Sequence, residues 1–290
     1  MADKKKKVRS VKDTPRHKVG VVLGTGFFVI LCAIIVFPVF AGLLASFRPG
    51  KELIRRGLSI DLDFSTMSLD NYTYLFSGNA DSQKYFMWYK NSLIITIVSV
   101  VLTLLICYFV AYGLTMYNYR LKNFLFFLVI ATMMVPFEIL MLPLYKEIIA
   151  IGLIDSYVGV IITGLCSAST IFFFKQYLSG LPKDLLDAAR IDGATRGQYF
   201  WRIALPLLVP SMKSAAILSM VGSLKYFDLI YVMTGGGPGT STELMATYMY
   251  KQSFKNFNMG YGSAVAGGMF ILISMVALIT MKLLKGKEEA

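Results

Sequence analysis

Long apolar runs, poor in charge, alternate along the chain with short stretches that hold most of the charged residues. Six such runs cover residues 19–47, 92–118, 124–144, 157–174, 206–233 and 262–281. A helix of about 20 residues crosses a hydrocarbon core of roughly 30 Å, and each run is near this length or longer. The runs lack the period-two alternation of membrane β-strands, and a backbone in lipid must satisfy its own polar groups. The pattern therefore predicts an all-α polytopic membrane protein with about six transmembrane helices.

The composition agrees with a membrane protein and limits the chemistry of the chain. Of the 290 residues, 56% are hydrophobic and 16% are charged, whereas soluble domains carry about 25% charged residues. The first run is about twice as long as the apolar part of a signal peptide, so we expect an uncleaved anchor. The three cysteines lie in three different runs and His17 is the single histidine. We therefore expect neither a disulfide framework nor a metal site.

Lysine and arginine are distributed unevenly between the two ends of the predicted spans. Eighteen of the 29 fall in the N-terminal tail, the 119–123 turn, the 175–205 loop and the C-terminal tail, nine fall in the opposite loops, and two lie in the fifth run. The positive-inside rule predicts that both termini and the 175–205 loop are cytoplasmic. The net charge of +12 is thus a topology signal. Nucleic-acid binding is not expected, because the basic residues flank spans and form no stripe with aromatic residues.

This orientation divides the chain into five predicted parts. They are a basic cytoplasmic tail (1–18), a first transmembrane helix (19–47), an extracytoplasmic loop (48–91), a five-helix core (92–281) and a cytoplasmic tail (282–290). The core contains a charged, alanine-rich loop at 182–206.

The loop at 182–206 carries its own helix signals. Pro182 followed by an acidic first turn is typical of a helix start, and Gly193 can adopt the left-handed conformation that ends a helix. We expect a short helix to about Asp192 and a second one over about 194–205. The first helix carries small and charged side chains: Asp187, Ala188, Ala189 and Arg190. The second carries aromatic and aliphatic ones: Tyr199, Phe200, Ile203 and Leu205. On these residues alone, a docking surface for a partner and an amphipathic connector are both possible.

The same loop resembles the EAA loop of binding-protein-dependent ABC importer permeases. That pattern is Glu-Ala-Ala, three residues, Gly, then an aromatic residue and Leu-Pro; the matching positions here are Asp187, Ala188, Ala189, Gly193, Phe200, Leu205 and Pro206. The similarity extends over roughly residues 38–280 and is closest to the maltose-type carbohydrate importers, whose permeases have six spans. The supporting segments are NSLIIT from Asn91, MMVPFEILMLPLY from Met133 and GLIDSYVGVII from Gly152.

The resemblance implies a permease subunit of an ATP-driven importer in the bacterial cytoplasmic membrane, carrying a carbohydrate such as an oligosaccharide. It also implies a second permease, two ATPase subunits that hold ATP and magnesium, and an extracytoplasmic solute-binding protein, for which the loop at 48–90 is a candidate contact. The short helix would be the coupling helix, seated in a groove of the ATPase. The implied coupling residues are Asp187, Ala188, Ala189, Asp192, Gly193 and Arg196.

Two features depart from the family pattern. Asp187 replaces the first glutamate, so the side chain is one methylene shorter and an ion pair with the ATPase would be weaker or bridged by water. The segment TGGGPGTST from Thr234 is similar to the companion permease, whereas MMVPFEILMLPLY is typical of the six-span partner. Both halves of the heterodimer therefore remain possible for this chain.

Polar and aromatic residues inside the apolar runs are candidates for a substrate cavity. A charge near the centre of a membrane helix costs about 2.5 to 3.5 kcal/mol, so it usually faces a cavity or a partner. The candidates are Glu138, Tyr226, Phe227, Asp228 and Tyr231. Lys225 could instead form a purely structural pair with Asp228, three residues on. Two prolines, Pro136 and Pro143, could break the third helix.

No residue pattern indicates catalysis in this chain, so ATP hydrolysis is expected in a partner. The run GGGPGTST at 235–242 lacks the lysine of a phosphate-binding loop, and no nucleophile–base motif is present. Three alternatives stay open: an ABC permease for another solute such as glycerol phosphate or a polyamine, a secondary transporter driven by an ion gradient, and a membrane scaffold or sensor subunit.

Overall fold

The computed structural model describes residues 15–50, 52–53, 65–77, 80–237 and 242–285, and all regular secondary structure in these residues is helical. The long helices are α1 (Pro15–Ala45), α4 (Ala80–Met116), α11 (Leu205–Leu224) and α14 (Met259–Lys285). The shorter ones are α3 (Asp70–Phe76), α5 (Lys122–Met133), α6 (Phe137–Ala150), α7 (Tyr157–Gly164), α8 (Ala168–Ser179), α9 (Lys183–Ile191), α10 (Arg196–Gln198), α12 (Asp228–Met233) and α13 (Met245–Tyr250). Two π-helical segments are η1 (Tyr199–Ala204) and η2 (Lys251–Lys255). The predicted all-α fold is confirmed.

The number of membrane spans agrees with the prediction. Four stretches are long and apolar enough to cross a membrane: Val19–Ala45, Tyr85–Met116, Arg196–Leu224 and Met259–Leu283. Two helix pairs meet the same test only together, because each helix alone is shorter than 18 residues. The two helices of each pair are bent relative to each other, α5 and α6 by 104° and α7 and α8 by 46°. The described residues therefore give four spans, or six when each bent pair counts as one.

The third apolar run is broken at one of its two prolines. Pro136 is the residue before α6, so the predicted break at this position is confirmed. Pro143 lies inside α6 and does not end it. The expectation of a break at Pro143 was wrong, because a proline within a membrane helix is tolerated where neighbouring groups satisfy the freed carbonyl.

The fourth and fifth runs are also broken, although each was predicted as one continuous helix. Ser167 interrupts the fourth run: its hydroxyl accepts a hydrogen bond from the Thr170 amide and so starts α8. The fifth run stops at Leu224, and α12 begins after a three-residue break. Lys225 lies at the C-terminal end of α11 and Asp228 at the N-terminal end of α12, where the helix dipoles favour these charges.

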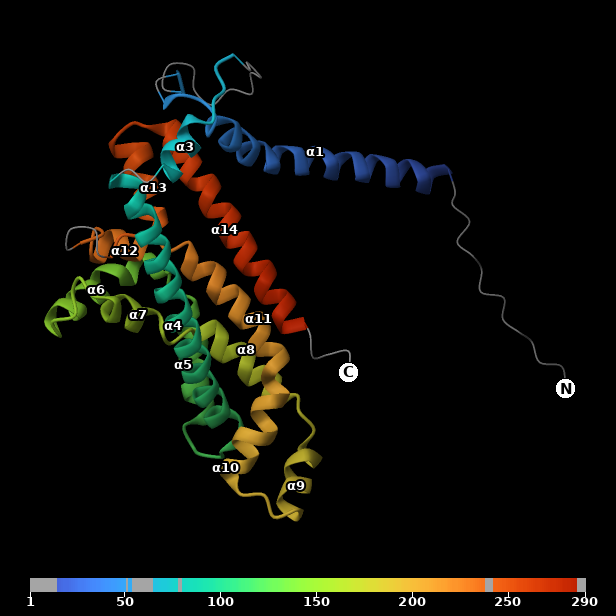
Figure 1. Ribbon diagram of the computed structural model, residues 1–290. Coiled ribbons are helices and arrows are strands. Elements are labelled where there is room, and N and C mark those ends of the chain that lie inside the picture. The colour runs from blue at the N-terminus through green and yellow to red at the C-terminus, as the bar shows by residue number, and fades with distance from the viewer. Residues whose placement is uncertain (1–14, 51, 54–64, 78–79, 238–241, 286–290) are drawn as a thin grey trace.

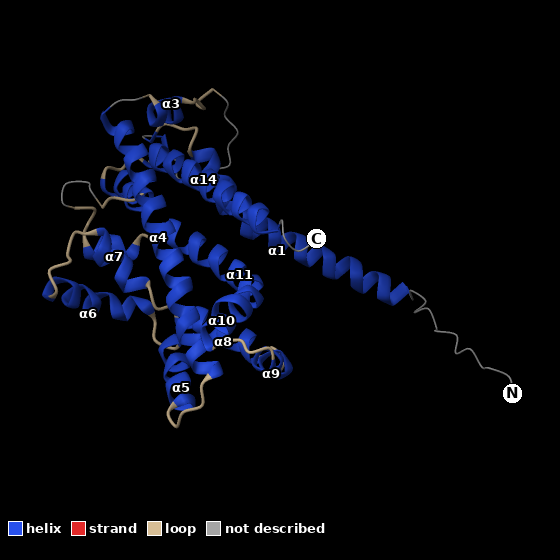
Figure 2. Ribbon diagram, turned by 60° about the horizontal axis from the view of Figure 1, so that its bottom comes forward, coloured by secondary structure: helices blue, strands red, loops and turns tan. Residues whose placement is uncertain are grey.

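The central helix α4 packs against α8 and α11, α5 and α7 also lie against it, and α14 packs on α11. Figure 1 shows α3 and α13 at one end of the molecule and α9 and α10 at the other. Helix α1 stands away from this body in both Figure 1 and Figure 2. It contacts α14 through its C-terminal part, where Ala41, Leu44 and Ala45 are buried, and its other apolar side chains are exposed.

The segment predicted as the extracytoplasmic loop 48–91 contains α3 and the start of α4, so the second long helix begins earlier than predicted. Together these parts form a cap on the helix bundle. Tyr85 and Trp88 at the start of α4 are buried against Tyr248 and Tyr261, and the Trp88 and Tyr248 rings lie 3.8 Å apart. Residues 51, 54–64 and 78–79 of this segment lie outside the described residues, as do 1–14 and 286–290 of the two predicted tails.

Candidate functional site

The loop at 182–206 folds as two short helices joined by a left-handed glycine. Gly193 has a φ of 75°, and its amide donates to the Arg190 carbonyl at 3.1 Å. The Ala194 amide donates to the Ala189 carbonyl at 2.9 Å. This pair of hydrogen bonds is the Schellman motif, which satisfies carbonyls at the end of α9. The predicted helix, glycine turn and second helix are confirmed.

A capping box starts the second helix of the loop. The Thr195 hydroxyl accepts from the Gln198 amide at 3.3 Å, and the Gln198 side chain accepts from the Thr195 amide at 2.8 Å. The box satisfies two amides that the first turn would otherwise leave without partners. The prediction did not use it, although its Thr-x-x-Gln spacing is visible in the sequence.

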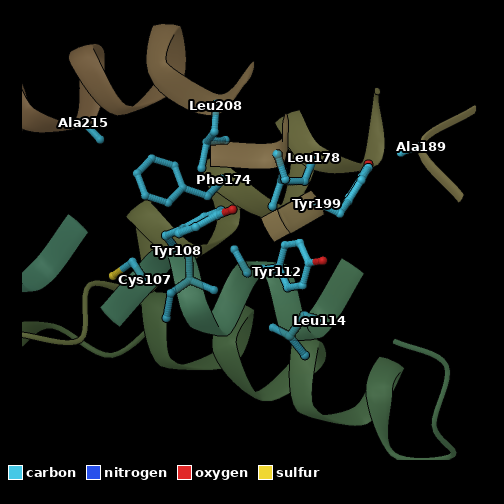
Figure 3. Close-up of a cluster of buried hydrophobic side chains, with 13 residues drawn as sticks. Cys107, Tyr108, Tyr112, Leu114, Phe174, Leu178, Ala189, Tyr199, Leu208 and Ala215 are labelled. Carbon is cyan, nitrogen blue, oxygen red and sulfur yellow. The ribbon is translucent and has the colours of Figure 1, made fainter. Parts of the chain in front are cut away.

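The loop is fixed to the body by aromatic side chains. Tyr199 is buried, and the Phe200 ring lies 4.6 Å from that of Tyr108 and 4.7 Å from that of Tyr112. The Tyr108 hydroxyl donates to the Phe200 carbonyl at 2.7 Å. Figure 3 shows Tyr108, Tyr112 and Tyr199 in the same cluster as residues of α8 and α11. Tyr199 and Phe200 therefore join the loop to α4 and to the start of α11.

The outer face of α9 is open. Asp187, Ala188 and Asp192 are exposed, and Arg190 pairs with Asp187 at 3.4 Å on this surface. Ile191 is 86% exposed at the last turn of α9. The sequence-based interpretation had not included this side chain on the outer face of α9.

Ala189 is buried within the chain and does not lie on the open surface. It is 7% exposed and packs in the cluster of Tyr199, so its proposed direct contact with a partner is corrected. The reason is helix periodicity, since Ala189 shares a face with Leu186, which also packs on this cluster. Arg196 is exposed, and together with Ala189 and Arg190 it lines a cavity of about 460 Å³ between α9, α10 and the end of α4.

A second cavity of about 620 Å³ lies where the broken helices meet. Its walls come from α4, from the α5–α6 and α7–α8 breaks, and from the end of α11. The polar lining consists of hydroxyl-bearing residues: Ser99, Thr103, Thr132, Thr163, Ser167, Ser169, Ser219, Ser223 and Tyr226. The volume is within the range of small-molecule sites, and broken membrane helices commonly form such sites.

The breaks expose backbone carbonyls, and α4 supplies a donor for them. The Cys107 thiol donates to the Ser167 carbonyl at 3.6 Å and lies 4.0 Å from that of Leu165. Gly164, just before this break, allows the close approach of Tyr226, because a Cβ at Gly164 would lie 3.0 Å from the Tyr226 hydroxyl. The α7–α8 break therefore packs against Cys107 and Tyr226 at the edge of the cavity.

The cavity contains one of the five residues predicted for it. Tyr226 is part of the lining, whereas Glu138, Phe227, Asp228 and Tyr231 are not. Glu138 is exposed on α6, because Phe137, Leu140 and Leu144 form the face of α6 that lines the cavity. These four residues lie outside this cavity, and their role in substrate binding stays a prediction.

Phe227, just before α12, and Tyr231, within α12, belong to a separate aromatic group. The Phe227 ring stacks on Tyr231 at 5.2 Å and lies 4.9 Å from that of Tyr250. Lys225 and Asp228 form no ion pair with each other among the described residues, so the structural pair considered above is absent.

An ion pair shapes the glycine-rich segment at the opposite end from α9. The Lys251 ammonium lies 2.7 Å from the Glu243 carboxylate and donates to the Gly235 carbonyl at 3.0 Å. Glu243 is only 3% exposed, and its carbonyl accepts from the Asn91 side chain at 3.3 Å. The segment is thus tied to η2 and α4; its residues 238–241 lie outside the described part.

Comparison with known proteins agrees with this architecture. Residues 104–287 match the family described as binding-protein-dependent transport system inner membrane component. The arabinooligosaccharides transport system permease protein AraQ of Bacillus subtilis is 43% identical over 217 residues, which cover 75% of this chain and 76% of AraQ.

Solved structures show the same fold. A bacterial ABC transporter involved in the import of the acidic polysaccharide alginate aligns with a TM-score of 0.72 and 16% identity, over 95% of this chain and 98% of that chain. The alginate transporter in complex with a periplasmic protein that holds an alginate pentasaccharide aligns with a TM-score of 0.65 and 16% identity, over 94% and 95% of the two chains. At this level of identity the likeness concerns the fold.

Proposed function

This chain belongs to the family of binding-protein-dependent transport system inner membrane components, and from this premise we propose that it is a permease subunit that translocates a carbohydrate, such as an oligosaccharide. The observation that carries the choice of substrate is the similarity to an arabino-oligosaccharide permease over three quarters of both chains. Family membership gives no support to a secondary transporter or a scaffold. The chain itself is not an enzyme, and ATP with magnesium would be bound by partner ATPases.

The outer face of α9 is the proposed contact with an ATPase subunit. Asp187, Arg190 and Asp192 place both signs of charge around the exposed Ile191. A protruding apolar side chain within a polar rim is the arrangement of a small protein–protein contact. Gly193 fixes the direction in which α9 projects, because it supplies the left-handed turn.

We propose that a movement of α9 is transmitted from this contact to the cavity. It would displace Tyr199 and Phe200, which pack on α4 and belong to the segment that continues directly into α11. These two helices also provide cavity walls through Thr103 and Ser219. Movement of the loop as a rigid body would therefore shift two walls of the cavity together and change its access.

Two further surfaces fit the proposed assembly. The exposed apolar faces of α1 would be covered by lipid and by a second permease subunit, since no described residue outside its C-terminal part covers this long apolar helix. The cap at the opposite end from α9 would receive the solute-binding protein. Both termini would be cytoplasmic; the turn at 117–121 and the α9 loop lie at one end of the molecule, as the positive-inside rule requires.

Proteoliposomes that contain both permeases and both ATPases provide the test. We expect the solute-binding protein loaded with an arabino-oligosaccharide to stimulate ATP hydrolysis, and the empty binding protein to do so less. Loading with glycerol phosphate or a polyamine is the matched comparison. Stimulation by one of these solutes and not by any oligosaccharide would contradict the proposed substrate and leave the importer assignment in place.

A further inference from the structure

Hydroxyl groups follow one face of α4 toward the cavity. Ser92, Thr96, Ser99 and Thr103 are spaced by four, three and four residues, which places them on one side of the helix. Thr96 donates to the Ser223 hydroxyl of α11 at 3.0 Å, so this part of the face is closed by a contact between helices. The next two positions, Ser99 and Thr103, reach the cavity.

Thr103 is buried and faces the cavity without a protein partner for its hydroxyl. It is 5% exposed, and its hydroxyl, which opens to the cavity, makes no side-chain hydrogen bond to a described residue. The threonines Thr115 and Thr163, in contrast, donate to the carbonyls of Ala111 and Val160 at 2.7 and 2.8 Å. A hydroxyl left without a partner at membrane depth is unfavourable, so Thr103 requires water or a ligand.

Two more cavity hydroxyls also lack a side-chain partner. Ser99 of α4 and Ser219 of α11 are half-buried and line the cavity, and neither hydroxyl forms a hydrogen bond with the described residues. A hydroxyl can both donate and accept, which matches the hydroxyls of a sugar in either direction. Phe137 and Tyr226 add aromatic surface to the same cavity, which suits the apolar face of a sugar ring.

The cavity lining carries no charged side chain; this holds for every one of its lining residues, all of which belong to the described part of the chain. A carboxylate or phosphate that entered would lose hydration and find no cation in this wall. An uncharged polyol would lose hydration of hydroxyls only and recover hydrogen bonds from serine and threonine.

We propose that Ser99, Thr103 and Ser219 form a substrate subsite that binds an uncharged oligosaccharide and discriminates against acidic ones. The proposal rests on the proposed function and adds two statements to it. This chain itself contacts the substrate, and its part of the cavity wall disfavours acidic substrates because it holds no charged side chain. This selectivity would differ from that of the alginate importer with the same fold, whose substrate is acidic.

The first test measures direct binding to the complete complex of permeases and ATPases in lipid nanodiscs, without any binding protein. The probes are α-1,5-linked arabinopentaose and alginate pentasaccharide, which have equal length and differ in charge. We expect the affinity for the acidic probe to be lower by at least about tenfold, because its carboxylates are desolvated without a partner. Equal affinity for the two probes, or no binding of arabinopentaose above empty nanodiscs, would overturn the proposal.

The second test removes single hydroxyls. Thr103→Val keeps the shape of the side chain, and Ser219→Ala removes little volume; each should weaken arabinopentaose binding about fivefold, the usual effect of one hydrogen bond. Thr115→Val is the matched control on the same helix, because its hydroxyl bonds within α4 and does not line the cavity. Unchanged affinity in both cavity variants, with normal complex yield, would refute the subsite.

These outcomes are separable from those of the proposed function. Stimulation of ATP hydrolysis by sugar-loaded binding protein depends on the importer assignment and not on the subsite. If that stimulation is present while both cavity variants bind arabinopentaose normally, the importer assignment stands and the subsite is wrong. If the stimulation is absent with every oligosaccharide, the proposed function is wrong.

Discussion

Replacement of Gly193 tests whether the turn after α9 is required for coupling. Gly193 has a φ of 75°, and a Cβ at this position would meet nothing within 4 Å. Gly193→Val therefore creates no clash, and its cost is that of the left-handed backbone, about 1 to 2 kcal/mol. This energy opposes the turn that positions α9, so ATPase affinity should fall by up to about five- to thirtyfold.

The assay is a titration of the purified ATPase against the two permeases in nanodiscs, followed by sugar uptake. Gly193→Asn should lose less than the valine variant, because asparagine adopts the left-handed conformation more readily. Gly197→Ala is the control, since Gly197 is helical in α10 and a Cβ there also meets nothing. If the valine variant binds ATPase and transports sugar as well as the control, the turn does not matter for coupling and the reasoning is wrong.

Three further predictions concern the two ends of the molecule. Ile191→Asp should weaken ATPase binding about ten- to a hundredfold, the value of one buried aliphatic side chain, and intact ATPase binding would exclude α9 as the contact. Cysteines introduced by Thr195→Cys and Asn256→Cys, in a cysteine-free background, should be labelled by impermeant reagents from the cytoplasmic and the external side respectively; labelling of position 195 on intact cells would invert the orientation. Lys251→Met should lower the free energy of unfolding by about 3 to 5 kcal/mol, because it leaves the Glu243 carboxylate buried without its cation. Adding Glu243→Gln to the same chain should restore part of the lost melting temperature. A Lys251→Met variant with a normal melting temperature would show that the ion pair is not needed for stability.

The sequence predicted the features that depend on local patterns. The apolar runs identified the spans, because a membrane helix requires about 20 apolar residues whatever surrounds it. The Gly193 turn was predictable for a similar reason, since glycine is the common residue at a left-handed helix end. The break at Pro136 follows from the missing amide of proline.

The cavity depends on tertiary contacts, and the sequence indicated it poorly. Charged and aromatic residues such as Glu138 and Tyr231 drew the prediction because they are conspicuous in apolar runs. Serine and threonine are common in membrane helices, where their hydroxyls bond to nearby carbonyls, so Thr103 and Ser219 gave no separate signal. What distinguishes them is the absence of such a bond, which becomes visible only when the helices are placed together.

The faces of α9 show the same limit. Ala188 and Ala189 are neighbours in sequence and were assigned one role, yet Ala188 is exposed and Ala189 is buried. Adjacent residues of a helix point about 100° apart, so the pattern of two alanines could not assign both to one surface. The burial of Tyr199 against the body decides which alanine faces inward.

Uptake of a labelled arabino-oligosaccharide into sealed proteoliposomes tests the central claim most directly. The vesicles contain the two permeases and the two ATPases with ATP enclosed on the ATPase side, and loaded binding protein is supplied on the other side. An ATP-driven importer predicts accumulation that persists when ionophores abolish all ion gradients and that stops when the enclosed ATP is replaced by a non-hydrolysable analogue. Accumulation that survives the analogue and is abolished by the ionophores would contradict the account.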